Sequence, residues 1–168
     1  MNAILERKSI RKYTDKMISK EIIEKILKAG MSAPSAVDEQ PWQFIVIDDK
    51  DTLNEITKIH PYSQMLKEAS HAIVVCGDMR LKKVDEDFWI QDCSAAAENM
   101  LVMAQALGLG AVWLGVYPIE ERFEGIGKLL KLPEQIIPFC VISLGYPGEK
   151  KNAGDRYNPE RVHWNKWQ

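Results

Sequence analysis

Two short segments of the chain combine residue types that suit a phosphorylated ligand with a flat ring. The first, Arg-Lys-Ser-Ile-Arg-Lys-Tyr at residues 7–13, gathers four cations around one hydroxyl. Arginine presents planar pairs of donors to phosphate oxygens, and a neighbouring serine hydroxyl adds another donor. The candidate phosphate ligands are Arg7, Lys8, Ser9 and Arg11. A solvated basic turn or a nucleic-acid patch is the alternative, because charge runs of this length are common.

The second segment, residues 33–44, is a loop of small residues that runs directly into an apolar stretch. Small side chains let backbone amides approach a flat ring closely. The candidate ring contacts are Pro34, Ser35 and Ala36, and the candidate polar contacts are Asp38 and Gln40. The alternative is a plain connection from helix to strand, in which Pro41 restrains Gln40 to an extended conformation.

A third segment, residues 113–116, places a glycine inside an apolar run. Glycine weakens a strand, and one reason to retain it is close approach of the backbone to a ligand. Leu114, Gly115 and Val116 are therefore candidate cofactor contacts, and a bulge or bend is the alternative. Arg156, in the polar sequence Gly-Asp-Arg-Tyr near the C-terminus, is one further candidate cation.

Several other chemistries lack the residues that they need. The sequence Gly-Leu-Gly at 108–110 lacks the third glycine and the preceding strand of a dinucleotide fingerprint, and there is no P-loop. No histidine has a cysteine or serine partner spaced for a catalytic triad, and no cluster has metal-ligand spacing. Cys76, Cys93 and Cys140 are widely spaced and odd in number, which predicts reduced cysteines rather than disulfides.

Composition favours one globular, cytoplasmic domain over residues 1–168. The chain is 46% hydrophobic and 27% charged, with a formal net charge of −2. This charge produces no field that would attract nucleic acid or an anionic membrane. No apolar run approaches the roughly 20 residues that span a bilayer. Residues 1–6 also lack the apolar region of a signal peptide.

Hydrophobic spacing predicts an α+β fold with four or five strands. Ser19 is expected to cap a helix that ends at Gly30, and Thr52 to open a capping-box helix towards Ile59. A short helix is expected after Pro61. Longer helices are expected at 85–107 and 119–130, and strands at 43–47, 72–76, 111–116 and 139–144. The strand at 43–47 is expected to be well buried, because it is nearly all apolar.

The last twenty residues, 149–168, form a polar tail with almost no aliphatic side chains. The tail carries Trp164 and Trp167, which would be large apolar surfaces if left in solvent. We therefore expect this C-terminal arm to dock on another surface, with a second subunit as the simplest choice.

Four motifs resemble those of the FMN-dependent nitroreductase family, in the same order and over essentially the whole chain. They are Arg-x-Ser-x-Arg at 7–11, Pro-Ser-Ala-x-x-x-Gln-Pro-Trp-x-Phe at 34–44, Leu-Gly-Leu-Gly-x-x-Trp-x-Gly at 107–115, and Gly-Tyr-Pro at 145–147 followed by Asp-Arg at 155–156. Each motif alone is weak, whereas four in register are specific.

The resemblance implies a three-layer α+β sandwich with a mainly antiparallel sheet. It also implies an obligate homodimer that holds FMN between its subunits and exchanges its C-terminal arms. By position, Arg7, Lys8, Ser9 and Arg11 would hold the FMN phosphate, ribityl chain and pyrimidine edge, with Arg156 at the phosphate. Pro34, Ser35 and Ala36 of the other subunit would lie near the ring, and Leu114, Gly115 and Val116 would bring a backbone amide towards flavin N5.

The resemblance further implies a reaction carried by the cofactor. Hydride would pass from NADH or NADPH to flavin N5, and the reduced flavin would then reduce a nitroaromatic, a quinone or a similar small acceptor. A cation such as Arg11 near flavin N1 would stabilise the reduced ring, and no side chain is assigned as acid or base. Two other classes stay open: a non-catalytic flavin-binding regulator, and a specialised relative such as a reductive dehalogenase or a flavin-cleaving enzyme.

Two positions depart from the family pattern. Asp38 stands where the family commonly has asparagine, so that polar contact does not carry over directly. Residues 60–65, His-Pro-Tyr-Ser-Gln-Met, do not reproduce the polar pyrimidine-binding pattern of the better-known members. The physiological substrate therefore does not follow from the resemblance.

Overall fold

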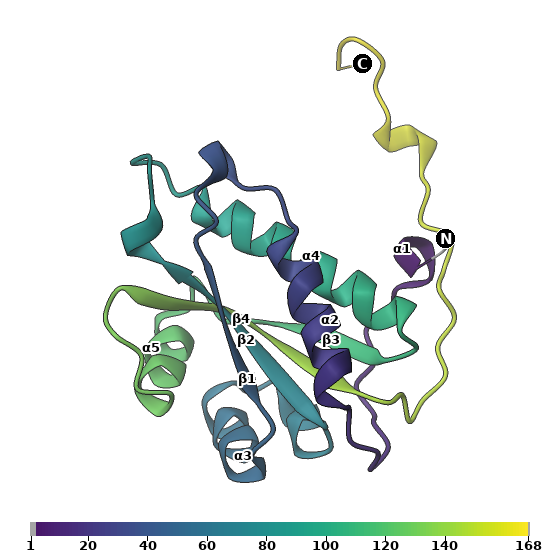
Figure 1. The fold of residues 1–168 in the computed structure, drawn as a ribbon. Helices are drawn as coiled ribbons and strands as arrows, with labels where there is room; N and C mark the ends of the chain where they lie inside the picture. Colours follow the sequence, from purple (N-terminus) through teal and green to yellow (C-terminus); the bar gives the residue numbers. More distant parts are fainter. Residues whose placement is uncertain (1–2, 168) are drawn as a thin grey trace.

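The chain folds around a four-stranded antiparallel sheet with the strand order β1-β2-β4-β3. The computed structural model describes residues 3–167. The strands are β1 (Trp42–Ile47), β2 (His71–Asp78), β3 (Gly110–Gly115) and β4 (Ile136–Gly145). β2 and β4 lie at the centre and β1 and β3 at the edges (Figure 1). The predicted antiparallel α+β architecture is confirmed.

Helices cover both faces of the sheet and give the predicted three layers (Figure 1). They are α1 (Ala3–Glu6), α2 (Lys20–Met31), α3 (Lys50–Ile59), α4 (Trp89–Ala106) and α5 (Glu120–Leu129). Short 3₁₀ turns form η1 (Ala36–Asp38), η2 (Gln64–Lys67), η3 (Met79–Leu81) and η4 (Pro159–Arg161). Within residues 3–167, no helix has the length and apolar character required to cross a membrane.

The two apolar layers follow from the alternation of side chains along the central strands. Ile73 and Val75 of β2 belong to the layer beneath α2 and α4, whereas Val74 and Cys76 belong to the layer beneath α3 and α5. Helix α4 buries residues around much of its circumference, as its apolar sequence predicts. The three cysteines are free and buried, which also agrees with the prediction.

One prediction about the sheet is wrong. Strand β1 is not well buried, since Val46 is 40% exposed, because β1 is an edge strand with a neighbour on one side alone. The bulge that was the alternative explanation of Gly115 is not at that position, where β3 ends. The register shift instead lies between Val75 and Cys76, opposite Pro138, which has no N–H to donate to a ladder.

Two helix starts also differ from the prediction. Helix α3 begins one turn earlier than expected, because the Asp49 carboxylate accepts the Thr52 N–H (2.8 Å) and acts as the cap in place of Thr52. Helix α4 begins at Trp89 rather than near residue 85. The preceding residues form a loop in which Lys82 Nζ donates to the Asp87 carboxylate (2.9 Å).

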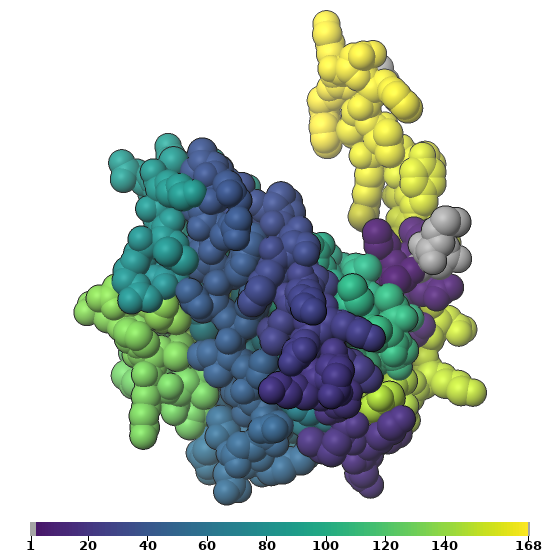
Figure 2. Space-filling model, viewed as in Figure 1, coloured from purple at the N-terminus to yellow at the C-terminus, as the bar shows by residue number. Residues whose placement is uncertain are grey.

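Beyond Gly148 the chain leaves the body of the protein as an extended arm. The arm runs past α1 and projects away from the sheet and its helices (Figures 1 and 2). Trp164 and Trp167 near its end are 78% and 86% exposed. The arm therefore presents two large aromatic surfaces to solvent.

Candidate functional site

The N-terminal cationic segment lies along the outer edge of β3. Ser9 forms an isolated parallel bridge with Ala111, and the Ile10 N–H donates to the Ala111 carbonyl (3.0 Å). Because β3 pairs with β4 on its other side, this segment adds a short fifth-strand contact to the sheet. The contact holds Ser9 beside the strand that leads to Gly115.

The two predicted arginines of this segment have different surroundings. Arg7 Nε lies 3.2 Å from a Glu98 carboxylate oxygen on α4, and its side chain is 19% exposed. Arg11 is exposed, and its backbone N–H donates to Glu149 Oε1 (2.6 Å). Among residues 3–167, no ion pair engages the guanidinium of Arg11. That guanidinium is therefore available to an anionic ligand.

The chain after β4 returns to this same edge. Lys151 Nζ donates to the Ser9 carbonyl (3.0 Å), and Lys8 lines a hollow together with Lys151 and its neighbours. Arg156 lines a second hollow, of about 440 Å³, together with residues 4–6. Residues 149–157 and the N-terminal segment thus run side by side, which brings Arg156 towards the other predicted phosphate ligands.

Gly115 presents its backbone to this edge of the sheet. Pairing alternates along an antiparallel strand. The Val116 N–H points inward to the Phe139 carbonyl (3.2 Å), whereas Ala111 bonds outward to the N-terminal segment. Gly115 is an even number of residues from Ala111, so its N–H and C=O also point outward. Gly115 is exposed, and a Cβ built on it would meet no atom within 4 Å, so there is open space beside its backbone.

The small-residue loop is closed by its own polar groups. Ser35 Oγ accepts the Gln40 N–H (3.1 Å), and Gln40 Nε2 donates to Asp38 Oδ1 (2.7 Å). Asp38 and Gln40 are therefore bound to each other. The alternative in which Pro41 restrains Gln40 to an extended conformation does not hold, since Gln40 has φ of +46°. These hydrogen bonds turn the backbone back on itself and override the preference of a residue that precedes proline.

Two buried carboxylates hold this loop to the body of the protein. The Ala36 N–H donates to Asp92 Oδ1 on α4 (3.0 Å), and Glu39 Oε2 accepts the Lys83 N–H (2.6 Å). Glu39 and Asp92 are 4% and 5% exposed, and each has one buried oxygen that no described residue binds. Burial, reinforced by the Glu39 carboxylate, raises the pKa of Asp92.

The loop is also strained. Val37, Asp38 and Gln40 all have positive φ, and Val37 at +43° is a β-branched residue in a region that such residues avoid. Strained backbone persists where the surroundings fix it, and it is concentrated at functional sites. The hydrogen bonds to Asp92 and Lys83 hold the loop in this strained conformation.

The predicted ligands thus form two separate groups within one chain. The loop at 34–40 bonds to Asp92 and Lys83, whereas the N-terminal cations bond to β3, Glu98 and the chain after β4. Among the residues that the structure describes, no hydrogen bond or ion pair joins one group to the other. Both groups contact α4, through Asp92 and Glu98, but they are not bonded to each other within one chain.

Several residues that build the site lie outside the sequence prediction. Glu39, Asp92 and Lys83 anchor the loop, and His60 and Arg122 bind the Gly115 carbonyl. Asp92 carries a usable sequence signal, since it is a carboxylate on the apolar side of a helix expected to be buried. The other four depend on contacts between distant segments and have no local signal.

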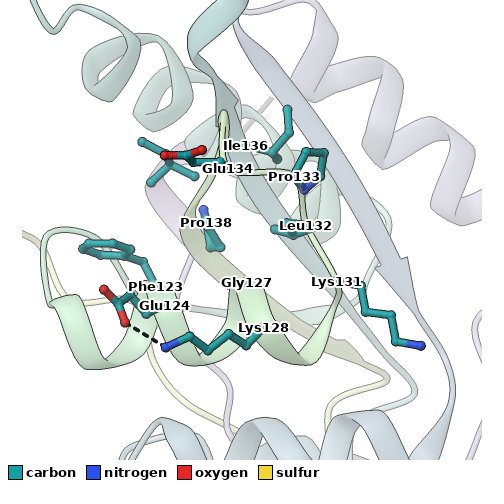
Figure 3. Close-up of a pocket in the computed structure, with 11 residues that line it drawn as sticks. Phe123, Glu124, Gly127, Lys128, Lys131, Leu132, Pro133, Glu134, Ile136 and Pro138 are labelled. Carbon is teal, nitrogen blue, oxygen red and sulfur yellow. Dashed lines mark hydrogen bonds and ion pairs between the residues drawn. The ribbon is translucent and has the colours of Figure 1, made fainter.

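A separate pocket of about 410 Å³ lies between α5 and the start of β4 (Figure 3). Apolar side chains such as Phe123, Leu132 and Ile136 line it, and the Glu124–Lys128 ion pair (2.9 Å) borders it. None of the predicted cofactor ligands contributes to this pocket, so it is distinct from the candidate site.

The fold is an α+β sandwich that carries the cationic segment at 7–11 along one edge of its sheet. The Nitroreductase family model matches residues 4–62 and 58–146. A relative from Archaeoglobus fulgidus, provisionally named an NADH dehydrogenase/NAD(P)H nitroreductase, is 54% identical over 170 residues, which cover 99% of this chain and 98% of the relative. The chain belongs to the nitroreductase family, and the predicted family and its oxidoreductase class are confirmed.

Two solved structures share the fold. One, from Parabacteroides distasonis and with the same provisional name, is 45% identical with a TM-score of 0.94, covering 99% of this chain and 97% of that one. The other, from Desulfovibrio desulfuricans, is provisionally named a nitroreductase and was solved in complex with FMN. It is 32% identical with a TM-score of 0.85, covering 99% of this chain and 96% of that one. The nitroreductase-like sandwich is thereby confirmed.

Proposed function

We propose that the protein is an FMN-dependent enzyme that oxidises NADH or NADPH and reduces a small electron acceptor, such as a nitroaromatic or a quinone. The two substrates would bind in turn at the same place beside the cofactor, so the oxidised nicotinamide would leave before the acceptor binds, in a ping-pong mechanism. Membership of the nitroreductase family and the FMN-bound relative support this proposal.

The observation that carries the proposal is the exposed backbone of Gly115. Gly115 ends an edge strand with open space on its Cβ side, and the segment that carries Arg7, Ser9 and Arg11 lies along that same edge. A flat ring requires close approach of the backbone, which a glycine permits. A phosphate requires cations, which the neighbouring Arg7 and Arg11 provide. The residues present therefore fit FMN.

Each group of residues has a distinct part in this proposal. The phosphate and polar chain of the cofactor would be held by Arg7, Lys8, Ser9, Arg11 and Arg156. The ring would be met by the backbone of Leu114, Gly115 and Val116, and on its other side by Pro34, Ser35, Ala36, Asp38 and Gln40 of a second subunit. Bound FMN would supply the redox chemistry, and the protein would orient it and exclude water.

The same proposal includes a homodimer of single-domain chains. Within one chain the loop at 34–40 and the N-terminal cations are separate groups. In a dimer, the loop of one subunit would lie beside the N-terminal cations of the other. The exposed Trp164 and Trp167 support this proposal, because aromatic residues are enriched at subunit interfaces. The C-terminal arm would then pack on the partner.

The visible spectrum of the purified protein tests the proposal directly. We expect a yellow protein that releases FMN, and not FAD, on heating, and that is bleached by NADH or NADPH in the absence of oxygen. Addition of a quinone or nitroaromatic should then restore the yellow colour. A protein that takes up no FMN on reconstitution would contradict the proposal. Bound flavin that neither nicotinamide reduces would instead favour a flavin-binding regulator.

A further inference from the structure

The Gly115 carbonyl is bound by two side chains from different parts of the fold. His60 Nε2 lies 2.8 Å from this oxygen, and Arg122 Nη1 donates to it at 2.9 Å. His60 directly follows α3, and Arg122 lies in the first turn of α5. Two helices on one face of the sheet therefore converge on a single backbone oxygen at the end of β3.

The hydrogen bonds of His60 identify which ring nitrogen carries the proton. Its Nδ1 accepts the Tyr62 N–H (3.2 Å), so the proton of a neutral ring lies on Nε2 and points to the Gly115 carbonyl. Burial, together with the positive charge of Arg122, lowers the pKa of His60 and favours this neutral form. Arg122 Nη1 and His60 Nε2 are 3.5 Å apart because both donate to the same acceptor, the Gly115 carbonyl.

Tyr62 adds a third component to this arrangement. Its ring lies edge-on to the His60 ring, with centroids 6.3 Å apart, and the Arg122 guanidinium carbon lies 5.8 Å from the Tyr62 centroid. The last distance lies within the range of cation–π attraction. Tyr62 thereby restrains the guanidinium and the imidazole that bind Gly115.

A glycine at this position needs more restraint of its backbone than any other residue type would. Glycine has the greatest backbone freedom, and this one lacks both a side chain and close neighbours that could limit it. The carbonyl that His60 and Arg122 bind belongs to the same peptide group as the Val116 N–H, which donates to Phe139 in β4. One peptide group is therefore held at both ends, which fixes the direction of the adjacent Gly115 amide.

We propose that His60 and Arg122 are positioning residues that orient the cofactor-facing amide of Gly115. This inference rests on the proposed function, since it takes the Gly115 amide as the contact to the cofactor ring. It also assigns a role to residues 60–65, the segment that departs from the polar pattern of the better-known nitroreductases. His60 of this segment would support the ring contact indirectly, because it binds the Gly115 carbonyl at the end of β3.

The decisive variant is Arg122→Met, because Arg122 is only half-buried and its replacement leaves the core intact. The protein is reconstituted with FMN, and flavin reduction by saturating NADH is followed by anaerobic stopped-flow absorbance. We expect the FMN Kd to change less than about threefold and the reduction rate to fall by about ten- to a hundredfold, the usual effect of a displaced reacting group. Arg122→Lys, which keeps a donor, should restore most of the rate.

Two control variants separate positioning from general effects. Lys128→Met removes a cation from the same helix without contact to Gly115, and it should leave the reduction rate unchanged. His60→Gln retains an N–H donor and should lower the rate less than His60→Ala. A reduction rate that returns to the wild-type value once Arg122→Met is saturated with FMN would overturn the inference, since the residue would then affect binding alone.

Amide hydrogen exchange provides a readout that needs no cofactor. The Val116 amide should exchange faster in Arg122→Met than in the wild type, because its peptide group has lost one of its restraints. Unchanged exchange together with an unchanged reduction rate would disprove the positioning role. If the wild-type protein bound no FMN, the proposed function would fail, whereas the exchange measurement would still report on the restraint itself.

Discussion

The Arg7 guanidinium lies 3.2 Å from the Glu98 carboxylate, which joins a predicted phosphate ligand to the surface of α4. The contact uses Nε of Arg7, so the two terminal nitrogens of the guanidinium remain able to bind a phosphate. Glu98 is 52% exposed and carries a negative charge beside the proposed phosphate site. The carboxylate therefore orients Arg7, and it would repel a phosphate bound at the proposed site.

The variant Glu98→Gln separates these two effects. Glutamine keeps an oxygen that can accept from Arg7 but removes the negative charge. An exposed ion pair is worth about 0.2–1 kcal/mol, so we expect FMN to bind about 1.4- to fivefold more tightly. Titration of the apoprotein with FMN measures the change, and salt should diminish it. Glu120→Gln, which removes an exposed acid elsewhere, should leave the Kd unchanged.

Arg7→Ala and Ser9→Ala should weaken FMN binding without affecting the chemistry of the bound cofactor. A charged hydrogen bond is worth roughly 1.5–3 kcal/mol, or about ten- to a hundredfold in affinity. Saturation with FMN should then restore most NAD(P)H oxidation. Fluorescence titration gives the affinity, and steady-state assays at high FMN give the activity. Activity that stays low at saturating FMN would show that these residues do more than hold the phosphate.

Arg11→Ala should behave differently from Arg7→Ala. If Arg11 lies at the pyrimidine edge of the ring, its loss removes a positive charge that favours the reduced cofactor. The midpoint potential of bound FMN should therefore fall, and flavin reduction should be slow even at saturating FMN. Equal reduction rates in the Arg7→Ala and Arg11→Ala proteins would mean that Arg11 has been given the wrong role.

Asp92→Asn should stabilise the protein at neutral pH. The raised pKa of Asp92 means that its ionised form is disfavoured in the folded state, so wild-type stability decreases as pH rises from the unfolded pKa through the folded one. Asparagine has no charge at any pH and still accepts the Ala36 N–H. A buried group without a partner costs about 1–3 kcal/mol, and each kilocalorie shifts Tm by about 2–4 °C at this chain length.

Thermal unfolding of Asp92→Asn across pH checks this prediction. The gain in Tm should be largest above the folded pKa of Asp92 and should vanish as pH falls towards the unfolded value. Asp87→Asn is the matched control of opposite sign, because a hydrogen bond from Lys82 lowers the pKa of Asp87. The Tm of Asp87→Asn should be below that of the wild type at neutral pH, and this difference should shrink as pH falls. A uniform gain for Asp92→Asn at all pH values would exclude charge burial as the cause.

The sheet and its helices could be predicted because their signals are local. The apolar run at 72–76 becomes the buried strand β2, and the spacing of Ile23 and Ile26 matches the buried side of α2. The errors arise where distant segments decide the outcome. Val46 is exposed because β1 has no outer neighbour, and no property of residues 43–47 reveals their place in the strand order.

The candidate site could be predicted only in part, because sequence motifs are local signals. Motifs identify short segments that are expected to touch a ligand, such as the surroundings of Ser9 and Gly115. They do not identify the residues that hold those segments in place. His60 and Gly115 are 55 residues apart and meet because the residue that follows α3 lies against the last residue of β3. Contacts of this kind depend on the tertiary fold and have no counterpart in a single sequence.

Deletion of the C-terminal arm after Gly148 should reduce both dimerisation and flavin retention. The arm carries Arg156, a predicted phosphate ligand, and the exposed Trp164 and Trp167, which are its main apolar surfaces. Sedimentation velocity measures the first effect, and absorbance of the purified protein measures the second. The double variant Trp164→Ser with Trp167→Ser, which keeps Arg156, should weaken dimerisation specifically. A truncated protein that stays dimeric and yellow would contradict the proposed role of the arm.

Gly115→Ala should separate folding from cofactor binding. A Cβ at this position meets no atom within 4 Å, and Gly115 is not among the glycines with positive φ, so the fold should tolerate alanine. We expect a Tm within about 2 °C of the wild type, because alanine restricts the unfolded chain and adds no clash. The added methyl group would instead occupy the space proposed for the ring.

FMN affinity and flavin reduction should therefore both fall by at least about tenfold in Gly115→Ala, since a displaced ring loses both contact and alignment. Gly110→Ala in the same strand is the contrasting variant. A Cβ there would lie 2.6 Å from Cγ2 of Ile10, so Gly110→Ala should lower Tm by disturbing the contact between β3 and the N-terminal segment. A Gly115→Ala protein with wild-type FMN affinity and wild-type reduction rate would show that the cofactor ring does not approach this end of β3.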